Sequence, residues 1–183
     1  MRKLILISVL LALCVMVYPN VGHTLGFEGF GGKIGLAMPE GDNALVFGAI
    51  GDLGSILPSL PPLKAETSLE YWGNSYDAFG MSSSTAVISI YGTAKYYFAN
   101  AGIAPFAGAG LGFTIIRASW DYTQPIYGIQ PKTSSSDSDI GLHIVGGVDV
   151  PIGTNMKFVA EAKYSTAYGD WFQITGGIVV KLN

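Results

Sequence analysis

An alternation of apolar and polar side chains over residues 63–72 is the feature that most constrains the fold of this chain. Successive side chains of a β-strand point to opposite faces of its sheet. One face of this segment carries Leu63, Ala65, Thr67, Leu69 and Tyr71, and the other carries Lys64, Glu66, Ser68, Glu70 and Trp72. Similar segments recur along the chain, although charged residues make up only 13% of it. This combination predicts a closed transmembrane barrel with an apolar outer face and a polar interior.

The N-terminus has the composition of a secretory signal peptide. Arg2 and Lys3 precede an apolar run over residues 4–18, which is shorter than the roughly 20 residues of a membrane-spanning helix. We expect a signal peptide over residues 1–24, cleaved between positions 22 and 26, and a barrel domain over residues 27–183. A retained N-terminal anchor is the alternative.

Cysteine usage and net charge exclude several classes of function. Cys14 is the only cysteine and lies within the apolar run, so we expect a mature chain with no disulfide and no thiolate metal site. The formal net charge of −3 becomes more negative once Arg2 and Lys3 are removed. Nucleic-acid binding calls for a basic patch, so we expect no nucleic-acid partner. We also expect no cofactor and no metal.

Eight segments are predicted to be strands, and turn-forming residues separate them. All eight reach the roughly 9–11 residues that a tilted strand needs to cross a bilayer. The predicted strands cover residues 27–38, 44–53, 63–72, 85–98, 106–117, 139–150, 156–166 and 171–183, and the second alternates least clearly. The predicted fold class is therefore all-β, an eight-stranded antiparallel up-and-down transmembrane β-barrel.

The predicted connections are long at one end of the barrel and short at the other. Residues 73–84 and 119–138 are polar, and we expect them to be extracellular loops. Short periplasmic turns are expected at residues 99–105 and 151–155, an asymmetry that is typical of outer-membrane barrels. Residues 39–43 are expected to form a turn. Residues 54–62 contain three prolines, which cannot continue a strand ladder, so a longer connection is expected there.

Aromatic residues cluster near the predicted strand ends. Because amphipathic rings favour the headgroup zone of a membrane, this clustering predicts two girdles of interfacial aromatic residues. The predicted outer girdle comprises Trp72, Trp120 and Trp171, and the periplasmic girdle comprises Tyr97, Phe98, Phe106 and Phe158. The alternative is that aromatic residues are simply common in strands.

Charged side chains recur on the predicted interior face. An eight-stranded barrel is just wide enough to be filled by its own side chains, and buried charges must be paired. We therefore expect an interior plug held by salt bridges rather than a conducting pore. The predicted interior polar network comprises Lys33, Lys64, Glu66, Glu70, Lys95, Asp139, His143, Asp149, Lys157, Glu161, Lys163 and Lys181.

Three alternating glycines, Gly108, Gly110 and Gly112, lie within one predicted strand. A phosphate-binding glycine loop instead links a strand to a helix, so this spacing does not indicate a nucleotide site. We expect these glycines to make room inside the barrel for long side chains on the opposite wall.

Four segments, in order, resemble small eight-stranded outer-membrane β-barrels of the OmpA/OmpX type and the OmpW-like type. They are AKYYF at residues 94–98, APFAGAGLG at 104–112, GGVDVP at 146–151 and AEAKYS at 160–165. The resemblance implies an outer-membrane location in a Gram-negative cell envelope, contact with outer-membrane lipids, and barrel-assembly machinery as a partner during biogenesis. The chain departs from such barrels at its end, Lys181-Leu182-Asn183, where they often carry a terminal aromatic residue.

The sequence predicts a porin-like integral protein with a structural or surface-interaction role and no enzymatic activity. The OmpW-like resemblance implies an alternative, a narrow channel for small or apolar molecules. A soluble lipocalin-like barrel is a further alternative, but its polarity would be reversed, with an apolar interior and a polar outside.

A lipid A-modifying enzyme is the remaining hypothesis, because outer-membrane lipid A deacylases resemble this chain in size and fold. Such enzymes use histidine, serine and glutamate together. Here His143 would be the base, with Glu161 on the next strand and Ser165 on the same face. No serine stands two residues after His143, where the chain has Val145. We therefore expect His143 to be a hydrogen-bonded part of the plug.

Overall fold

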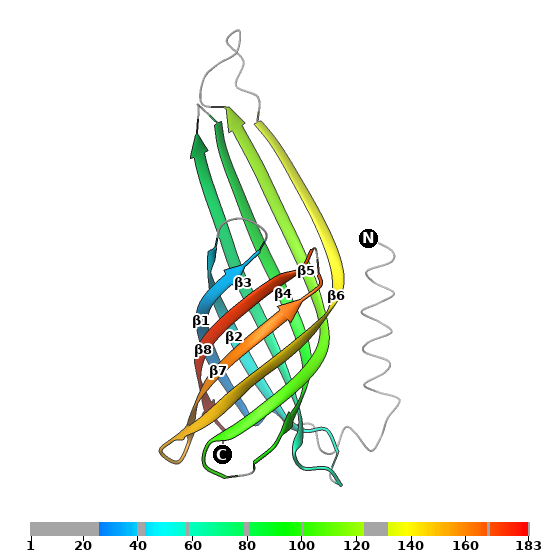
Figure 1. Cartoon of the computed structure of the whole chain (residues 1–183), viewed down its shortest axis with the longest axis vertical. Coiled ribbons are helices and arrows are strands. Elements are labelled where there is room, and N and C mark those ends of the chain that lie inside the picture. Colours follow the sequence, from blue (N-terminus) through cyan, green and yellow to red (C-terminus); the bar gives the residue numbers. More distant parts are fainter. Residues whose placement is uncertain are drawn as a thin grey trace.

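The chain folds into a closed antiparallel barrel of eight strands (Figure 1). The computed structural model describes residues 26–39, 43–57, 59–78, 81–99, 101–122, 132–167 and 169–182, so the predicted signal peptide lies outside the described residues. The strands are β1 (Gly29–Met38), β2 (Ala44–Ser55), β3 (Leu63–Ala78), β4 (Met81–Tyr97), β5 (Ala104–Tyr122), β6 (Lys132–Ile152), β7 (Met156–Ser165) and β8 (Trp171–Lys181). The predicted fold class is confirmed.

Each strand pairs with its neighbours in sequence, and β1 closes the barrel by pairing with β8. Lys33 marks this closure, since it lies opposite Gly48 of β2 on one side and Gly177 of β8 on the other. A closed barrel pairs the backbone groups of every spanning strand, as the bilayer core requires. Among the described residues there is no helix with the length and the apolar composition needed to cross a membrane.

Side chains alternate between the outside and the inside of the barrel, as the sequence predicts. In β8 the outward residues Phe172, Ile174 and Ile178 are exposed, whereas Gln173 and Thr175 are buried. Apolar side chains on the other strands are exposed in the same way, among them Phe30, Ile34, Leu45, Phe47, Leu69, Ile90, Leu111, Leu142 and Ile144. So large an apolar surface is unfavourable in water and suits a lipid environment.

Four consecutive strands are longer than the others and rise beyond the barrel at one end (Figure 1). β3, β4, β5 and β6 have 16, 17, 19 and 21 residues, whereas the other four have 10 to 12. We call their projecting part the extension, which comprises residues 73–78, 81–86, 117–122 and 132–141. Long connections lie outside the cell in outer-membrane barrels, so we assign the extension to the extracellular end.

The structure corrects the two extracellular loops that the sequence predicted. Much of residues 73–84 and 119–138 is paired strand: Asn74 lies opposite Thr85, and Ser119 lies opposite Ser134. These segments lack an apolar alternation because the extension is largely exposed to water, so neither face has to be apolar. Residues 79–80 and 123–131 lie outside the described residues.

Smaller differences occur at other strand ends. β2 continues to Ser55 through a register shift between Asp52 and Gly54, where Gly54 has a φ of +77°. A bulge of this kind favours glycine because its backbone angle is strained for other residues. At the β6–β7 connection, Pro151 belongs to β6 and the turn is shorter than predicted. The predicted turn at residues 39–43 falls largely outside the described residues.

Candidate functional site

An ionic network crosses the middle of the barrel. The Nζ atom of Lys33 on β1 lies 2.6 Å from Glu70 Oε1 on β3 and 2.6 Å from Glu161 Oε1 on β7. Neither β3 nor β7 is adjacent to β1 in the sheet. Each contact therefore passes inside the barrel over one intervening strand, β2 or β8, and Lys33 joins three separate parts of the wall.

Two further lysines extend the network. Lys95 Nζ on β4 lies 2.6 Å from Glu66 Oε1 and 3.1 Å from Glu161 Oε2, and Lys163 on β7 pairs with Glu70. The network thus comprises Lys33, Glu66, Glu70, Lys95, Glu161 and Lys163, with exposed fractions between 1% and 6%. Removing a charge from water costs several kcal/mol, so a layer of three cations and three anions is stable only because the charges are paired.

Hydroxyl groups and close packing complete this layer. Thr175 Oγ1 donates to Glu161 at 3.2 Å, and Ser68 Oγ donates to Glu70 at 3.1 Å. A void of about 10 Å³ remains between these side chains, lined in part by Thr93 and Val145. That volume is close to the space needed by one water molecule, so the side chains at this level of the lumen are closely packed.

A second charged cluster lies toward the periplasmic end. Lys157 Nζ lies 2.9 Å from Asp52 Oδ2 and 2.8 Å from Asp149 Oδ2, and the Tyr97 hydroxyl donates to Asp149 at 3.0 Å. Sequence reasoning missed Asp52 because β2 alternates poorly. The spacing of Asp52 in the sequence could have identified it. Asp52 stands two residues after the buried Ile50, and side chains two residues apart on a strand share one face.

Three of the residues predicted for the interior network lie outside it. Lys64 is only partly buried and pairs with Glu28 at 3.1 Å near the periplasmic rim. Lys181 is exposed at the end of β8, and Asp139 is exposed on the extension. The strand face was correctly identified at these positions, but at the ends of the strands the interior face meets water.

His143 is buried beside the ionic network, and its direct contacts are with neutral side chains. Its Nε2 atom lies 2.9 Å from Thr93 Oγ1, and its ring meets the ring of Tyr91 edge-on, with centroids 4.9 Å apart. Ser165 stands opposite His143 in the β6–β7 register, but Glu161 is held by two lysines and a threonine. The structure thus brings His143 and Ser165 to one level of the lumen and directs Glu161 into the ionic network.

Four of the seven predicted interfacial aromatic residues instead point into the barrel. Trp72, Tyr97, Phe106 and Trp171 are between 3% and 9% exposed. The prediction was wrong for these four because each shares the strand face of interior residues, and that alternation decides orientation. The other three are exposed: Phe98 and Phe158 on outward positions, and Trp120 on the extension.

The interior glycines make room for large side chains, but these belong to the neighbouring strands rather than to the opposite wall that the sequence predicted. A Cβ atom on Gly112 would overlap the ring of Tyr91, and one on Gly110 would lie 2.8 Å from His143 Cε1. A Cβ on Gly108 would press against the backbone of Ala94. Gly112 and Gly110 therefore leave space for the bulky side chains of their cross-strand neighbours, Tyr91 and His143.

These features define a class of protein, the small outer-membrane β-barrel with a side-chain-filled interior. The family model of the outer membrane protein beta-barrel domain matches residues 7–178, so the chain belongs to this family and is a protein of the outer membrane. No curated protein matches the sequence.

Solved structures show the same fold at low sequence identity. The attachment invasion locus protein Ail of Yersinia pestis is 13% identical with a TM-score of 0.57, covering 84% of this chain and 95% of its own. Neisserial surface protein A is 19% identical with a TM-score of 0.57 and the same coverage, 84% and 95%. A major outer membrane protein from Thermus thermophilus is 10% identical with a TM-score of 0.61, covering 84% of this chain and 99% of its own.

Proposed function

We propose that this protein is a non-enzymatic outer-membrane barrel that is closed to solutes and presents its extension to partners outside the cell. The observation that carries the proposal is the ionic network, which fills the lumen from wall to wall. A filled lumen favours an anchor over the narrow channel that the sequence left as an alternative. The engagement of Glu161 with lysines also disfavours the lipid A-modifying enzyme.

The extension supports the surface-interaction part of the proposal. Among the described strands, residues 132–141 of β6 pair only with β5, and residues 73–78 of β3 pair only with β4. Unpaired strand edges can accept a further strand from a partner. The extension therefore offers two backbone edges as well as its serine-rich faces.

The net charge of the extension favours some classes of partner over others. It carries four aspartates, Asp77, Asp121, Asp137 and Asp139, against Arg117 and Lys132. Ail of Yersinia pestis has been solved in complex with the heparin analogue sucrose octasulfate. The acidic excess on this chain disfavours a polyanion of that kind, and we propose a neutral or basic protein segment as the partner.

Planar-bilayer recording tests the closed lumen. The purified, refolded protein should give no stepwise conductance, whereas a variant with Lys33, Glu70, Glu161 and Lys163 all replaced by alanine should conduct if it still folds. Folding of both proteins is checked by the change in gel mobility on heating. Reproducible steps from the wild-type protein at the level of the alanine variant would refute the closed barrel.

Cysteine labelling tests the presentation of the extension. Ser134 lies on the extension and Ala101 lies in the β4–β5 connection at the opposite end, and both are exposed. A membrane-impermeant maleimide should label Ser134→Cys on intact cells and Ala101→Cys only after the outer membrane is opened. The reverse pattern would show that the extension faces the periplasm.

The proposal also includes the barrel-assembly machinery as a partner during insertion, with lipids surrounding the apolar outer face. Cells depleted of that machinery should accumulate the chain without its heat-resistant folded form. Normal recovery of that form under depletion would remove this partner from the proposal.

A further inference from the structure

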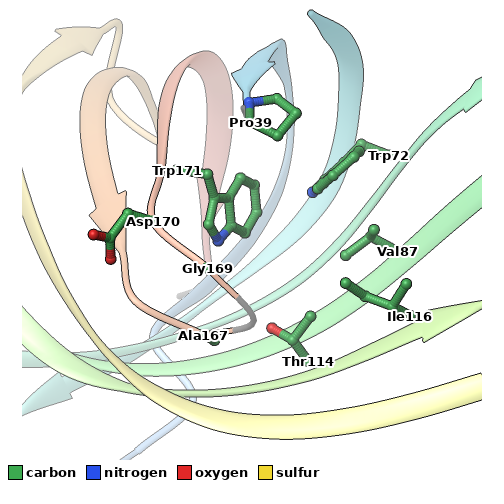
Figure 2. A pocket seen from close by; sticks show the side chains of 9 residues that line it. All are labelled: Pro39, Trp72, Val87, Thr114, Ile116, Ala167, Gly169, Asp170 and Trp171. Carbon is green, nitrogen blue, oxygen red and sulfur yellow. The ribbon is translucent and has the colours of Figure 1, made fainter. Parts of the chain in front are cut away.

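A cavity of about 520 Å³ opens at the extracellular mouth of the barrel (Figure 2). Its lining combines residues of several strands with the described residues 167, 169 and 170 of the β7–β8 connection. The lining residues are Pro39, Trp72, Val87, Thr114, Ile116, Ala167, Gly169, Asp170 and Trp171. Its volume is within the range of small-molecule sites, which is roughly 300–1,000 Å³.

Two tryptophans give the cavity rigid aromatic walls. Trp72 of β3 is 7% exposed and Trp171 of β8 is 5% exposed, and their ring centroids lie 5.2 Å apart at an interplanar angle of 51°. Both belong to a buried cluster that includes Val46 and Val87. Because these rings are held by packing, the cavity is formed before a ligand arrives.

The cavity also contains a buried hydrogen-bond donor without an acceptor. The Nε1 atom of Trp72 is buried and has no hydrogen-bond partner among the described residues. An indole N–H can only donate, and a buried donor left unpaired is unfavourable. An occupant with an acceptor group would satisfy it.

The other lining groups limit the charge of an occupant. The Asp170 carboxylate points away from the two rings in Figure 2, and the Thr114 hydroxyl is already bonded to Ser89 at 2.9 Å. Among the described lining residues, the remaining side chains are apolar apart from the indole N–H groups of the two tryptophans. A charged ligand would lose its hydration here without gaining an ion pair.

We infer that this cavity is a binding site for a small uncharged aromatic molecule that carries a hydrogen-bond acceptor. The ring of the ligand packs against Trp72 and Trp171, and its acceptor bonds to Trp72 Nε1. The site is a dead end, because the ionic network of Lys33, Glu70 and Glu161 closes the lumen beneath it. The barrel therefore receives this ligand from outside and does not conduct it.

Indole N–H signals in ¹⁵N–¹H NMR spectra of the full mature barrel give a direct test. The chain has three tryptophans, and Trp120 lies on the extension, so its signal serves as an internal control. Titration with acetophenone should shift the Trp72 and Trp171 signals to saturation and leave the Trp120 signal in place. Parallel, non-saturating drift of all three signals, or no shift of the first two, would overturn the inference.

The hydrogen bond is tested with ethylbenzene, which has a similar shape but no acceptor. Loss of one hydrogen bond of about 1 kcal/mol corresponds to roughly fivefold weaker binding. Trp72→Phe keeps the aromatic wall and removes the donor, so it should weaken acetophenone binding by the same factor and leave ethylbenzene binding unchanged. Equal losses for both probes would overturn the assignment of an acceptor-bearing ligand.

A filling variant separates the cavity from the rest of the barrel surface. Ile116→Phe places a larger side chain in the cavity, and it should weaken acetophenone binding at least tenfold while the heat-dependent gel shift persists. Leu111→Phe is the matched control, because Leu111 is 52% exposed on the outer face of the same strand. Equal binding by the Ile116 variant and the control would overturn the location.

Discussion

The ammonium group of Lys33 on β1 lies 2.6 Å from the carboxylate of Glu161 on β7, although the two strands are not adjacent in the sheet. The contact runs through the interior rather than along the wall. A transmembrane barrel is stabilised around its circumference by strand pairing, and this contact adds a tie inside the lumen between two strands that do not pair. In the proposed closed barrel, the same contact lies in the route that a solute would take.

Glu161→Ala should destabilise the barrel by about 3–5 kcal/mol, because it leaves Lys33 and Lys95 buried with too few anions. Lys64→Ala is the matched control. Its pair with Glu28 is partly exposed, so its loss should cost about 0–1 kcal/mol. Urea unfolding in lipid vesicles measures both, and similar losses would show that the network is hydrated.

Gly112→Ala should destabilise the barrel by about 1–3 kcal/mol, because the added methyl group overlaps the ring of Tyr91. Gly92→Ala is the control on the neighbouring strand, since a Cβ there has nothing within 4 Å. Combining Gly112→Ala with Tyr91→Val should recover part of the loss. No recovery in the double variant would contradict a steric origin.

Tyr97→Phe removes the hydrogen bond to Asp149 and should cost about 1.5–3 kcal/mol, since the acceptor is charged and buried. Tyr96→Phe, on the adjacent outward position, should change stability by less than about 0.5 kcal/mol. The same unfolding assay distinguishes them. A larger effect at Tyr96 would mean that the two side chains are exchanged between inside and outside.

Trp72 and Trp171 should be shielded from lipid. In a Trp120→Phe background, brominated lipids should quench little of the remaining fluorescence, because both rings lie inside the barrel. The control replaces all three tryptophans by phenylalanine and introduces Tyr71→Trp, on an outward position that is 49% exposed. Strong quenching of Trp72 and Trp171 would restore the predicted outer girdle.

Mass spectrometry of the protein extracted from outer membranes should find an N-terminus created by cleavage between positions 22 and 26. An intact Met1 in the membrane-inserted form would instead support a retained anchor.

The alternation of residues along each strand carried most of the correct predictions. It placed Lys33, Lys95 and Glu161 on the interior face, and the narrow bore of eight strands required such charges to pair. The same alternation also indicates that Trp72 and Tyr97 point into the barrel. The prediction for these two residues was wrong because it relied on the clustering of aromatic residues near strand ends instead. Orientation is set locally by the backbone, and the sequence is sufficient for it.

The sequence by itself determined the strand faces, the polar interior and the closed barrel, because a period of two and the bilayer's demand for paired backbone groups leave few alternatives. Only the tertiary structure decided which charges meet. Lys33 joins Glu70 and Glu161 because barrel closure and strand stagger bring distant segments to one level of the lumen. The tertiary structure also decided that residues 73–78 and 132–141 form strands, since their order comes from pairing with neighbours rather than from an apolar face.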